Sequence, residues 1–490
     1  MEMRQIIERA IAFGRQHKSA QTGYFHYCHV AQEDQPHQTI PVVENMMYAL
    51  ALLRARHVDN INEVKELLEG LLHFQNKEEL SLFAGNFPIY LHEYPICKDR
   101  FNGLHVSCII YWILKQYPQG LGNELRAKLK EALQKGLSHA IKTHFDKAAP
   151  YHIAVKLASL ALAGGDFLEI EEFKSFGRST LDDLCHFEDK DAWYSPRLLG
   201  VMLSGLVMVY PSLKLSPWSR LWDHLSIMWH KETGSYVGPA VKEYQKGFEP
   251  ECCLLDAFMC YYAGSFSKRA LKPSLMHLEA VLVPESEDGF LSLDYPVVKE
   301  GICCGRNWLL YRDEKIAYSL LFAGSSNDPK GEYACKVVWG NMERVHTMAI
   351  QGGNSSLIKA EGKNCEIKLE FSLSETVEVE DREKCRDLIL YFDVHEEMHF
   401  LNEGQKASTF RLQDTLVMQD AFCKMSLTFS LLSGEGKFLG HQMLGNRLSQ
   451  LSCKGNARFD AYDWLLFIRT LGRSQDAKLG LTIKLELREN

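Results

Sequence analysis

The sequence lacks the short motifs that mark several large classes of protein. It contains no CxxC pair, which gives little support to a structural zinc site. Neither GxxxxGK[ST] nor GxSxG occurs, and Gly434, Gly436 and Gly440 do not have GxGxxG spacing. No nucleotide cofactor is therefore indicated by a motif.

Features of membrane, secreted and nucleic-acid-binding proteins are also scarce. No stretch of 18 or more apolar residues occurs, and the N-terminus lacks the basic, apolar and small-residue order of a secretory signal. The net charge is −8, and no run of Lys and Arg with interleaved aromatics offsets it. The fourteen cysteines are irregularly spaced, which favours buried free thiols over a disulfide framework. We expect a soluble, cytoplasmic protein that binds neither nucleic acid nor a membrane.

The first half of the chain has helical periodicity. A chain of 490 residues exceeds the size at which one core keeps growing, so two domains are expected. Up to about residue 262 the apolar spacing predicts ten helices. They cover residues 2–16, 41–57, 61–74, 102–117, 122–145, 150–164, 168–186, 195–210, 216–229 and 249–262.

Every second helix of this series is nearly apolar along its whole length, whereas the alternate helices are amphipathic. A helix that is apolar all round is buried on all sides, and an amphipathic helix lies outside it. The alternation predicts an incomplete (α/α) toroid of about five helical hairpins over residues 1–265. From residue 276 to 490, short runs alternate apolar and polar residues between turn residues, which predicts an antiparallel β-sandwich.

The segments that lead into the inner helices carry the unusual polar residues. If the inner helices run parallel, their N-termini open on one face, where the helix dipoles favour bound anions. Polar residues also cap helices anywhere, and the alternative for His105 is a hydrogen-bonded core histidine. The lead-in residues are Gln38, Thr39, Glu44, Asn45, Asp99, Arg100, Asn102, His105, Tyr151, His152, Trp193, Tyr194 and Arg197.

The stretch 229–256, before the fifth inner helix, is the richest in functional groups. Glycine and proline break regular structure there, and aromatic, basic and acidic side chains suit proton transfer and sugar stacking. An ordinary turn-rich connection is the alternative. The side chains concerned are His230, Tyr236, Lys242, Tyr244, Glu249 and Glu251.

An HExxH pattern occurs at residues 395–399. Its chemistry needs both histidines on one face of a helix, where they share a zinc ion. The flanking segments alternate like strands, and in extended chain residues four apart are roughly 13 Å from each other. A zinc peptidase is therefore not predicted, and no catalytic metal is assigned.

Two chemistries suit the polar residues of the lead-in segments. Paired carboxylates would serve a glycoside hydrolase, with Glu44, Glu93, Asp99, Glu232, Glu243, Glu249 and Glu251 as candidates. β-Elimination at a uronic acid instead needs a group that neutralises the carboxylate, a base for the α-proton and an acid for the leaving oxygen. Asn, His and Arg suit the first task, and Tyr suits the other two.

The chain resembles polysaccharide lyases of the heparinase II/III and chondroitin AC lyase type. A helical toroid followed by a β-sandwich is their architecture. Asn102-Gly-Leu-His105 resembles the entry to their catalytic helix, and Thr233-Gly-Ser-Tyr236 followed by Tyr244-Gln-Lys-Gly247 resembles their tyrosine segment. The resemblance implies a carbon–oxygen lyase that acts on an acidic oligo- or polysaccharide.

The resemblance also implies roles for individual residues. Asn102 would neutralise the substrate carboxylate with His105 or His152 as its partner, and Tyr244, or less favourably Tyr236, would be the acid and base. Arg100 and Arg197 would grip the anionic chain, and Trp193 and Tyr194 would stack on sugar rings. The remaining substrate-binding candidates are Tyr151, Lys242 and Glu249. No cofactor is implied, although some relatives bind zinc or calcium in the β-domain, and a hydrolase or a non-catalytic carbohydrate-binding protein on this scaffold stays open.

Overall fold

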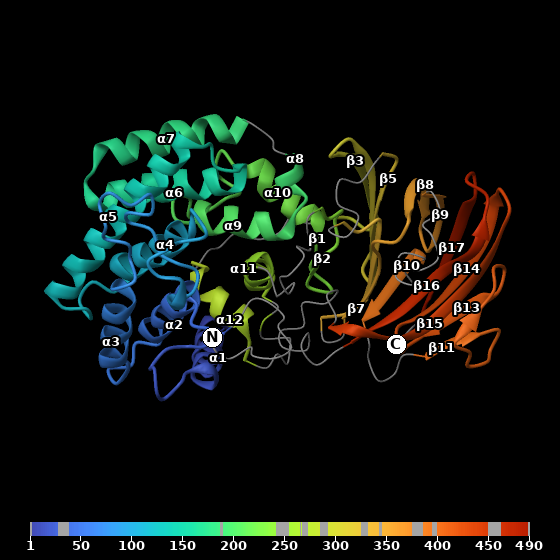
Figure 1. Cartoon of the computed structure of the whole chain (residues 1–490), viewed down its shortest axis with the longest axis horizontal. Coiled ribbons are helices and arrows are strands. Elements are labelled where there is room, and N and C mark those ends of the chain that lie inside the picture. Colours follow the sequence, from blue (N-terminus) through green and yellow to red (C-terminus); the bar gives the residue numbers. More distant parts are fainter. Residues whose placement is uncertain are drawn as a thin grey trace. The chain divides into compact units, whose positions relative to one another are not determined.

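The computed structural model of the chain describes most of its length (Figure 1). The described residues are 2–27, 39–186, 190–241, 254–264, 266, 273–284, 293–324, 332–342, 345–374, 386–393, 399–448 and 462–488. By their contacts, the residues form two compact units. One unit comprises Met1–Asp223 and Gly247–Phe290, and the other comprises His224–Lys246 and Leu291–Asn490.

The helices follow the predicted series closely. The main ones are α1 (Glu2–His17), α2 (Val42–Arg54), α3 (Asn60–Leu72), α4 (Asn102–Gln116), α5 (Asn123–Asp146), α6 (Tyr151–Leu168), α7 (Glu171–His186), α9 (Pro196–Leu206), α10 (Ser219–Met228) and α11 (Leu254–Tyr262). Short elements not predicted are α8 (Lys190–Trp193), α12 (Leu275–Glu279), and the 3-10 turns η1 (Leu91–Glu93) and η2 (Ala280–Leu282). Within the described residues, no helix has both the length and the hydropathy needed to cross a membrane.

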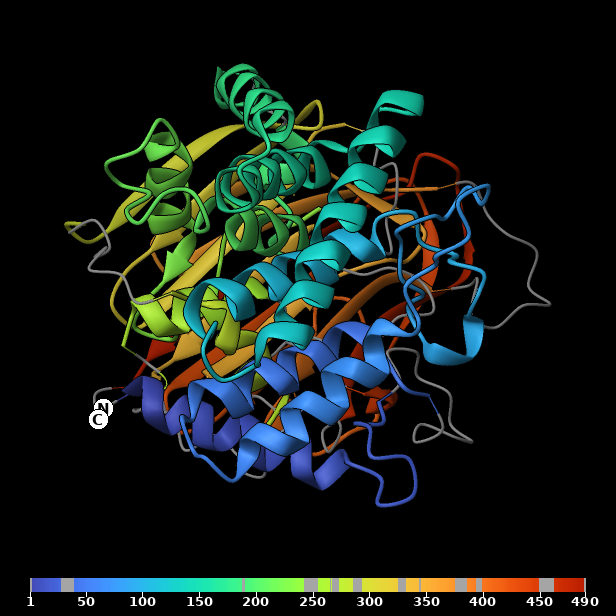
Figure 2. The ribbon, with the colours of Figure 1, turned by 90° about the vertical axis from the view of Figure 1, so that its left-hand side faces the viewer.

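The inner helices are α2, α4, α6, α9 and α11, as the apolar patterns predicted. Each packs against the next in this order, while α3, α5 and α7 pack against the inner helix that precedes them in the chain (Figure 2). Almost every side chain of α4 from Val106 to Leu114 is buried, because neighbours enclose the helix. On α5, by contrast, burial is confined to one face.

A short late segment closes the ring of described helices. Helix α12 packs against α11, α1 and α2. Arg54, the last residue of α2, donates from Nη1 to the carbonyl oxygens of Val281 (2.6 Å) and Val283 (3.1 Å). These two bonds satisfy backbone acceptors of the closing segment, so α2 and the segment after α12 are held together.

The β-unit consists of two packed antiparallel sheets and a small hairpin. The strands are β1 (Trp229–His230), β2 (Ser235–Tyr236), β3 (Val297–Cys303), β4 (Arg306–Arg312), β5 (Ile316–Phe322), β6 (Cys335–Gly340), β7 (Val345–Ile350), β8 (Ser355–Lys363), β9 (Glu366–Leu373), β10 (Arg386–Asp393), β11 (His399–Asn402), β12 (Thr409–Phe410), β13 (Thr415–Gln419), β14 (Cys423–Ser433), β15 (Gly436–Leu448), β16 (Tyr462–Arg473) and β17 (Lys478–Leu487). One sheet has the order β12-β15-β16-β10-β7-β6-β5-β4-β3, and the other has the order β11-β13-β14-β17-β9-β8.

The core of the β-unit lies between the inward faces of these two sheets. Phe371, Phe392, Phe429 and Leu466 belong to one continuous cluster of buried side chains from both sheets. The alternation along β14, with every second residue buried from Cys423 to Phe429, is the pattern of a strand that has one face in a core. An α/α toroid followed by an antiparallel β-sandwich, predicted from the sequence, is confirmed.

The observed division of the chain differs from the predicted boundary in two segments. The sequence placed residues 1–265 in the toroid and 276–490 in the sandwich, whereas residues 276–290 cluster with the helical unit and residues 224–246 cluster with the sandwich. Arg312 of β4 accounts for this association, because it is fully buried and donates to the carbonyl oxygens of Ser226 (3.0 Å) and Ile227. Pairing of this kind between distant segments leaves no trace in local periodicity.

Candidate functional site

The first turns of α2 and α4 lie at the same end of the helical unit. The backbone N–H of Val42 donates to the carbonyl of Ile89 (3.0 Å), and that of Leu91 donates to Ile40 (3.0 Å). A few residues earlier in the same segment, the carbonyl of Pro88 accepts from Nδ2 of Asn102 (2.6 Å). Residues 86–91 thus connect the starts of both inner helices, in agreement with parallel inner helices.

Asn86 holds the start of α4 in place. Its Oδ1 accepts from the N–H groups of Phe87 (2.9 Å) and Gly103 (2.7 Å), and its Nδ2 donates to the carbonyl of Asp99 (2.8 Å). A Cβ at position 103 would lie 2.6 Å from Oδ1 of Asn86, so a larger residue there would displace the Asn86 amide. The Asn86 side chain therefore accepts from one of the N–H groups in the first turn of α4 that have no partner within the helix.

A close pair of titratable groups near these helix starts is His105 with Lys156. Nζ of Lys156, on α6, lies 2.8 Å from Nδ1 of His105, on α4. Lys156 is 2% exposed, whereas His105 is partly exposed. Helix α9 covers the lysine closely, since a Cβ at Gly205 would lie 2.7 Å from the Cα of Lys156. His105 is therefore the member of the pair that a ligand reaches first.

The electrostatics of this pair are unusual because no carboxylate among the described residues pairs with Lys156. Burial lowers the pKa of Lys156. Burial, the charge of Lys156 and the nearby His152 together hold the pKa of His105 well below its usual value. The thiol of Cys108 is not a counter-ion, because burial raises its pKa to about 11. Within the described part of the chain, the buried amino group of Lys156 therefore has the imidazole of His105 beside it and no anion.

Chemically, the pair can present a proton donor backed by a positive charge. When Lys156 is protonated it can only donate, so Nδ1 of His105 accepts and the imidazole proton resides on Nε2. A ligand carboxylate that accepted from Nε2 would also compensate the buried charge. Of the predicted residues, His105 and His152 are brought together with Lys156.

Asn102 lies one turn before His105, and its side chain forms hydrogen bonds with the backbone. Its Nδ2 donates to the carbonyl oxygens of Pro88 (2.6 Å) and Phe87 (3.4 Å), and the side chain is buried. The amide nitrogen that was expected to neutralise a substrate carboxylate is therefore engaged in backbone hydrogen bonds. The predicted role of Asn102 in neutralising a substrate carboxylate stays untested.

The other candidates of the helical unit have varied surroundings. The carbonyl of Arg100 lies 3.0 Å from Nε2 of His139, and the side chain of Arg100 is exposed. Tyr151 is buried and donates its hydroxyl to the carbonyl of Leu184 (3.2 Å), which fastens α6 to α7. Trp193 and Tyr194 are partly buried at the end of α8, and Arg197 is exposed in the first turn of α9. Their binding roles remain predictions.

The stretch 229–256 differs most from expectation. Its first part forms the β1–β2 hairpin, in which His230 is buried, with Nδ1 2.8 Å from Oγ1 of Thr233 and Nε2 2.7 Å from the carbonyl of Asp313. Tyr236 is buried and donates to the carbonyl of Pro239 (3.1 Å). The hairpin therefore serves the β-unit's interior, which argues against Tyr236 as the acid and base. Lys242, Tyr244 and Glu249 lie outside the described residues.

The remaining predicted groups are the HExxH pattern and the carboxylates of the hydrolase alternative. Among the described residues, no group of three His, Cys, Asp or Glu side chains has metal-binding geometry. Of the HExxH pattern, residues 395–398 lie outside the described part, and His399 begins strand β11 rather than a helix. Glu93 forms an ion pair with Lys98 (2.9 Å). All cysteines of the described part are free thiols.

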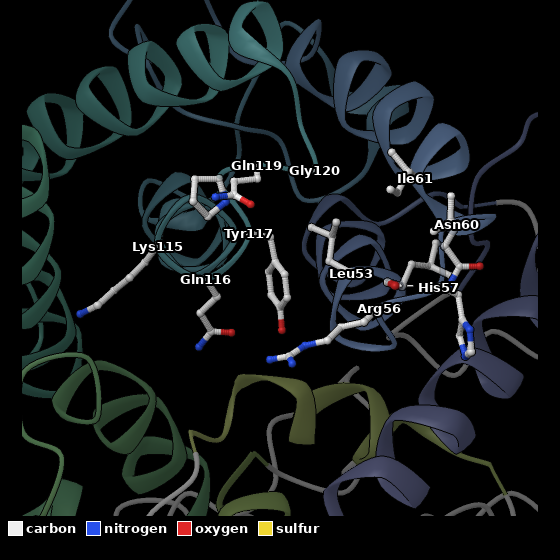
Figure 3. Close-up of a pocket in the computed structure, with 13 residues that line it drawn as sticks. Leu53, Arg56, His57, Asn60, Ile61, Lys115, Gln116, Tyr117, Gln119 and Gly120 are labelled. Atoms are coloured by element: carbon white, nitrogen blue, oxygen red, sulfur yellow. Dashed lines mark hydrogen bonds between the residues drawn. The ribbon is translucent and has the colours of Figure 1, made fainter.

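A cavity of about 470 Å³ lies at the opposite ends of the inner helices. It is lined by the C-terminal residues of α2 and α4 and by the segments that follow them, including Arg56, Lys115, Gln116 and Tyr117. Figure 3 shows the Tyr117 phenol and the Arg56 guanidinium pointing toward each other, with the Gln116 amide beside them. None of these residues was among the sequence candidates.

Comparison with known proteins reveals a similar structure but no similar sequence. No protein-family model and no curated protein sequence matches this chain. The chondroitin AC lyase of Streptomyces coelicolor A3, solved in complex with chondroitin sulphate, is similar with a TM-score of 0.50 and 10% sequence identity, over 99% of this chain and 79% of that chain. This lyase shares the fold. A tyrosine-to-alanine mutant of the same enzyme gives a TM-score of 0.44 at 10% identity and the same coverage.

Sequence reasoning missed Lys156, although a signal for it existed. It is the only charged residue between His152 and Asp166 in an inner helix that is otherwise apolar or small. Lysine is almost never fully buried without a partner, so a lysine inside a helix expected to be buried on all sides is unusual. The sequence alone therefore indicates Lys156 as a candidate site residue, in addition to the polar residues of the lead-in segments.

Proposed function

We propose that the chain is a polysaccharide lyase-like enzyme that cleaves an acidic, uronate-containing polysaccharide by β-elimination. The observation that carries the proposal is the His105–Lys156 pair, in which a buried lysine lies 2.8 Å from an imidazole and pairs with no carboxylate of the described residues. A bound uronate would supply the missing anion. The fold shared with a lyase that was solved with chondroitin sulphate supports the same substrate class.

The proposed reaction makes specific demands on the site. Nε2–H of His105, with the charge of Lys156 behind it, would neutralise the carboxylate at C5 and make the C5 proton acidic. A base then removes that proton, the electron pair forms the C4–C5 double bond, and the C4–O bond breaks. The departing oxygen takes a proton from an acid. Tyr244, which lies outside the described residues, remains the proposed acid and base on the resemblance of its segment.

The test is whether an unsaturated uronate forms. Incubation of the whole chain with a panel of uronate polymers should raise the ultraviolet absorbance of the new double bond without consumption of water. Lys156→Met should reduce the rate at least roughly a hundredfold, because a hydrogen bond backed by a buried charge is lost from the transition state. Lys128→Met, on the exposed face of α5, serves as the matched control and should retain full activity.

Other outcomes identify the alternatives. New reducing ends without absorbance would indicate a hydrolase that uses paired carboxylates. Saturable binding of the polymers without any turnover would indicate a carbohydrate-binding protein on this scaffold. Full activity of Lys156→Met would refute the role given to the His105–Lys156 pair, whatever the reaction.

A further inference from the structure

The cavity between the ends of α2 and α4 is lined by basic side chains, although the chain as a whole is acidic. Its lining includes Arg56, Lys115 and His57 but no Asp or Glu. The whole sequence carries a net charge of −8, so this is a local reversal of sign. A concave site of this size with convergent polar groups is a binding-site candidate, and its sign favours an anionic ligand.

Arg56 occupies a backbone position that disfavours arginine. It follows the C-terminal cap of α2 with φ of 55°, and its N–H donates to the carbonyl of Leu53 (3.0 Å). Glycine is the usual residue in this left-handed position at a helix end. Its guanidinium, which is exposed, has no hydrogen bond or ion pair with any residue that the structure describes. The conformational cost of the left-handed backbone is therefore not offset by any contact of the guanidinium with the described residues.

The groups around Arg56 suit a small polar ring. The hydroxyl of Tyr117 and the amide of Gln116 point into the same space as the guanidinium (Figure 3), and neither has a hydrogen-bond partner among the described residues. Leu53, Ile61 and Pro118 form an apolar wall. The ammonium of Lys115 donates to the hydroxyl of Tyr111 (2.6 Å), so it adds positive charge at the edge of the cavity.

We propose that this cavity binds one acidic sugar unit, with its carboxylate or sulfate on Arg56. The sugar hydroxyls would meet Gln116 and Tyr117, and the C–H face of the ring would lie on the apolar wall. An inorganic anion would leave that wall in water, and an uncharged apolar ligand would leave Arg56 without a counter-ion. The site lies at the ends of the inner helices opposite to His105 and does not depend on the proposed elimination.

Calorimetry on the whole chain tests the proposal with four probes. D-Glucuronate and N-acetyl-D-glucosamine 6-sulfate carry the two acid groups, D-glucose is the neutral ring, and sodium sulfate is the anion alone. At least one acidic sugar should bind with a Kd of about 1 mM or below, and glucose and sulfate should bind at least roughly tenfold more weakly. The acidic sugar with the lower Kd identifies the acid group, carboxylate or sulfate, that the cavity prefers.

Two glycine substitutions separate binding from backbone effects. Arg56→Gly should weaken acidic-sugar binding roughly tenfold to a hundredfold, without a loss of thermal stability, because glycine tolerates the left-handed conformation. Glu169→Gly relieves the same conformation at the end of α6, where φ is 61°, and should leave affinity unchanged. Tyr117→Phe should cause a smaller loss than Arg56→Gly.

Three results would overturn the proposal. The first is absence of binding by either acidic sugar at about 10 mM. The second is unchanged affinity in both Arg56→Gly and Tyr117→Phe. The third is binding that survives Arg56→Gly but disappears in Lys156→Met, since this would assign the sugar to the site near His105. Sulfate that binds as tightly as the acidic sugars would reduce the cavity to a simple anion site and refute the sugar assignment.

Discussion

Nζ of Lys156 and Nδ1 of His105 lie 2.8 Å apart and belong to neighbouring inner helices of the toroid. The two side chains differ in what their loss should do to stability. His105→Leu leaves a buried ammonium without its hydrogen-bond acceptor, whereas Lys156→Met removes the buried charge itself. We expect His105→Leu to lower the free energy of unfolding by about 2 kcal/mol or more, and Lys156→Met to leave it unchanged or raise it by about 1 kcal/mol.

Chemical denaturation of both variants and of the double variant measures this asymmetry. The free energy of unfolding of the double variant should be close to that of Lys156→Met. The reason is that the cost of His105→Leu comes from the lysine that has lost its hydrogen-bond acceptor. If Lys156→Met proved the more destabilising of the two single changes, the lysine would have to have an anionic partner in the folded chain.

Asn102 should behave as a structural residue. Asn102→Ala removes a side-chain donor from the buried carbonyl oxygens of Pro88 and Phe87, which should cost about 2 kcal/mol of unfolding free energy. Asn123→Ala, an exposed asparagine in the first turn of α5, is the matched control and should change stability by less than about 0.5 kcal/mol. Equal stabilities of the two variants in urea melts would contradict the structural assignment.

The buried carboxylate of Asp420 should be one of the strongest single supports of the sandwich. Its Oδ2 accepts from Nε1 of Trp339 (2.7 Å), and its Oδ1 accepts from the N–H groups of Phe422 and Cys423 (2.8 Å each). Asp420→Ala strands all three donors, so we expect a loss of about 3 kcal/mol, against about 1 kcal/mol for Trp339→Phe. Tryptophan fluorescence in a denaturant series reports both, and a loss in Asp420→Ala no larger than that in Trp339→Phe would refute this.

His230 should make the β-unit less stable in mild acid. Burial, followed by the charge of Arg312, lowers the pKa of His230 to about 4, below the value of 6.5 expected when unfolded. The unfolded chain therefore binds the proton more readily between these values, and stability present above pH 6.5 is lost as the pH falls toward 4. The total loss is roughly 3 kcal/mol.

Replacement of the histidine isolates this contribution. Unfolding free energies at about pH 5 and about pH 7 should differ by roughly 2 kcal/mol less in His230→Gln than in the natural sequence. Because other buried histidines titrate too, the difference between the two proteins is the relevant quantity. Identical pH dependence in both proteins would refute the prediction, because it would mean that the pKa of His230 is the same in the folded and the unfolded chain.

Helical periodicity was sufficient to predict the toroid because burial is a property of a whole helix. A helix such as α6, apolar on every side, has to be surrounded, and the amphipathic α7 has to cover it. Strand alternation predicted the sandwich for the same reason. The order of the strands and the short α12 were not predictable, since both depend on contacts between distant segments.

The site was only partly predictable because spacing identifies polar residues but not their partners. His105 and His152 were identified as residues at helix starts, yet their partner Lys156 comes from the second turn of α6. Asn102 looked equally functional, and only the position of Pro88 shows that its amide nitrogen is occupied. Arg56 was overlooked because a left-handed backbone after a helix end is not visible in the sequence unless glycine marks it.

The closure of the ring through α12 also constrains how the protein is made. Helices α1 and α2 leave the ribosome before the segment that covers them, residues 275–283, which emerges more than two hundred residues later. Each helical hairpin can form locally during synthesis, while the surface of α1 that packs against α12 waits for its last neighbour. Nascent chains that stop before residue 273 should therefore depend on chaperones to stay out of aggregates.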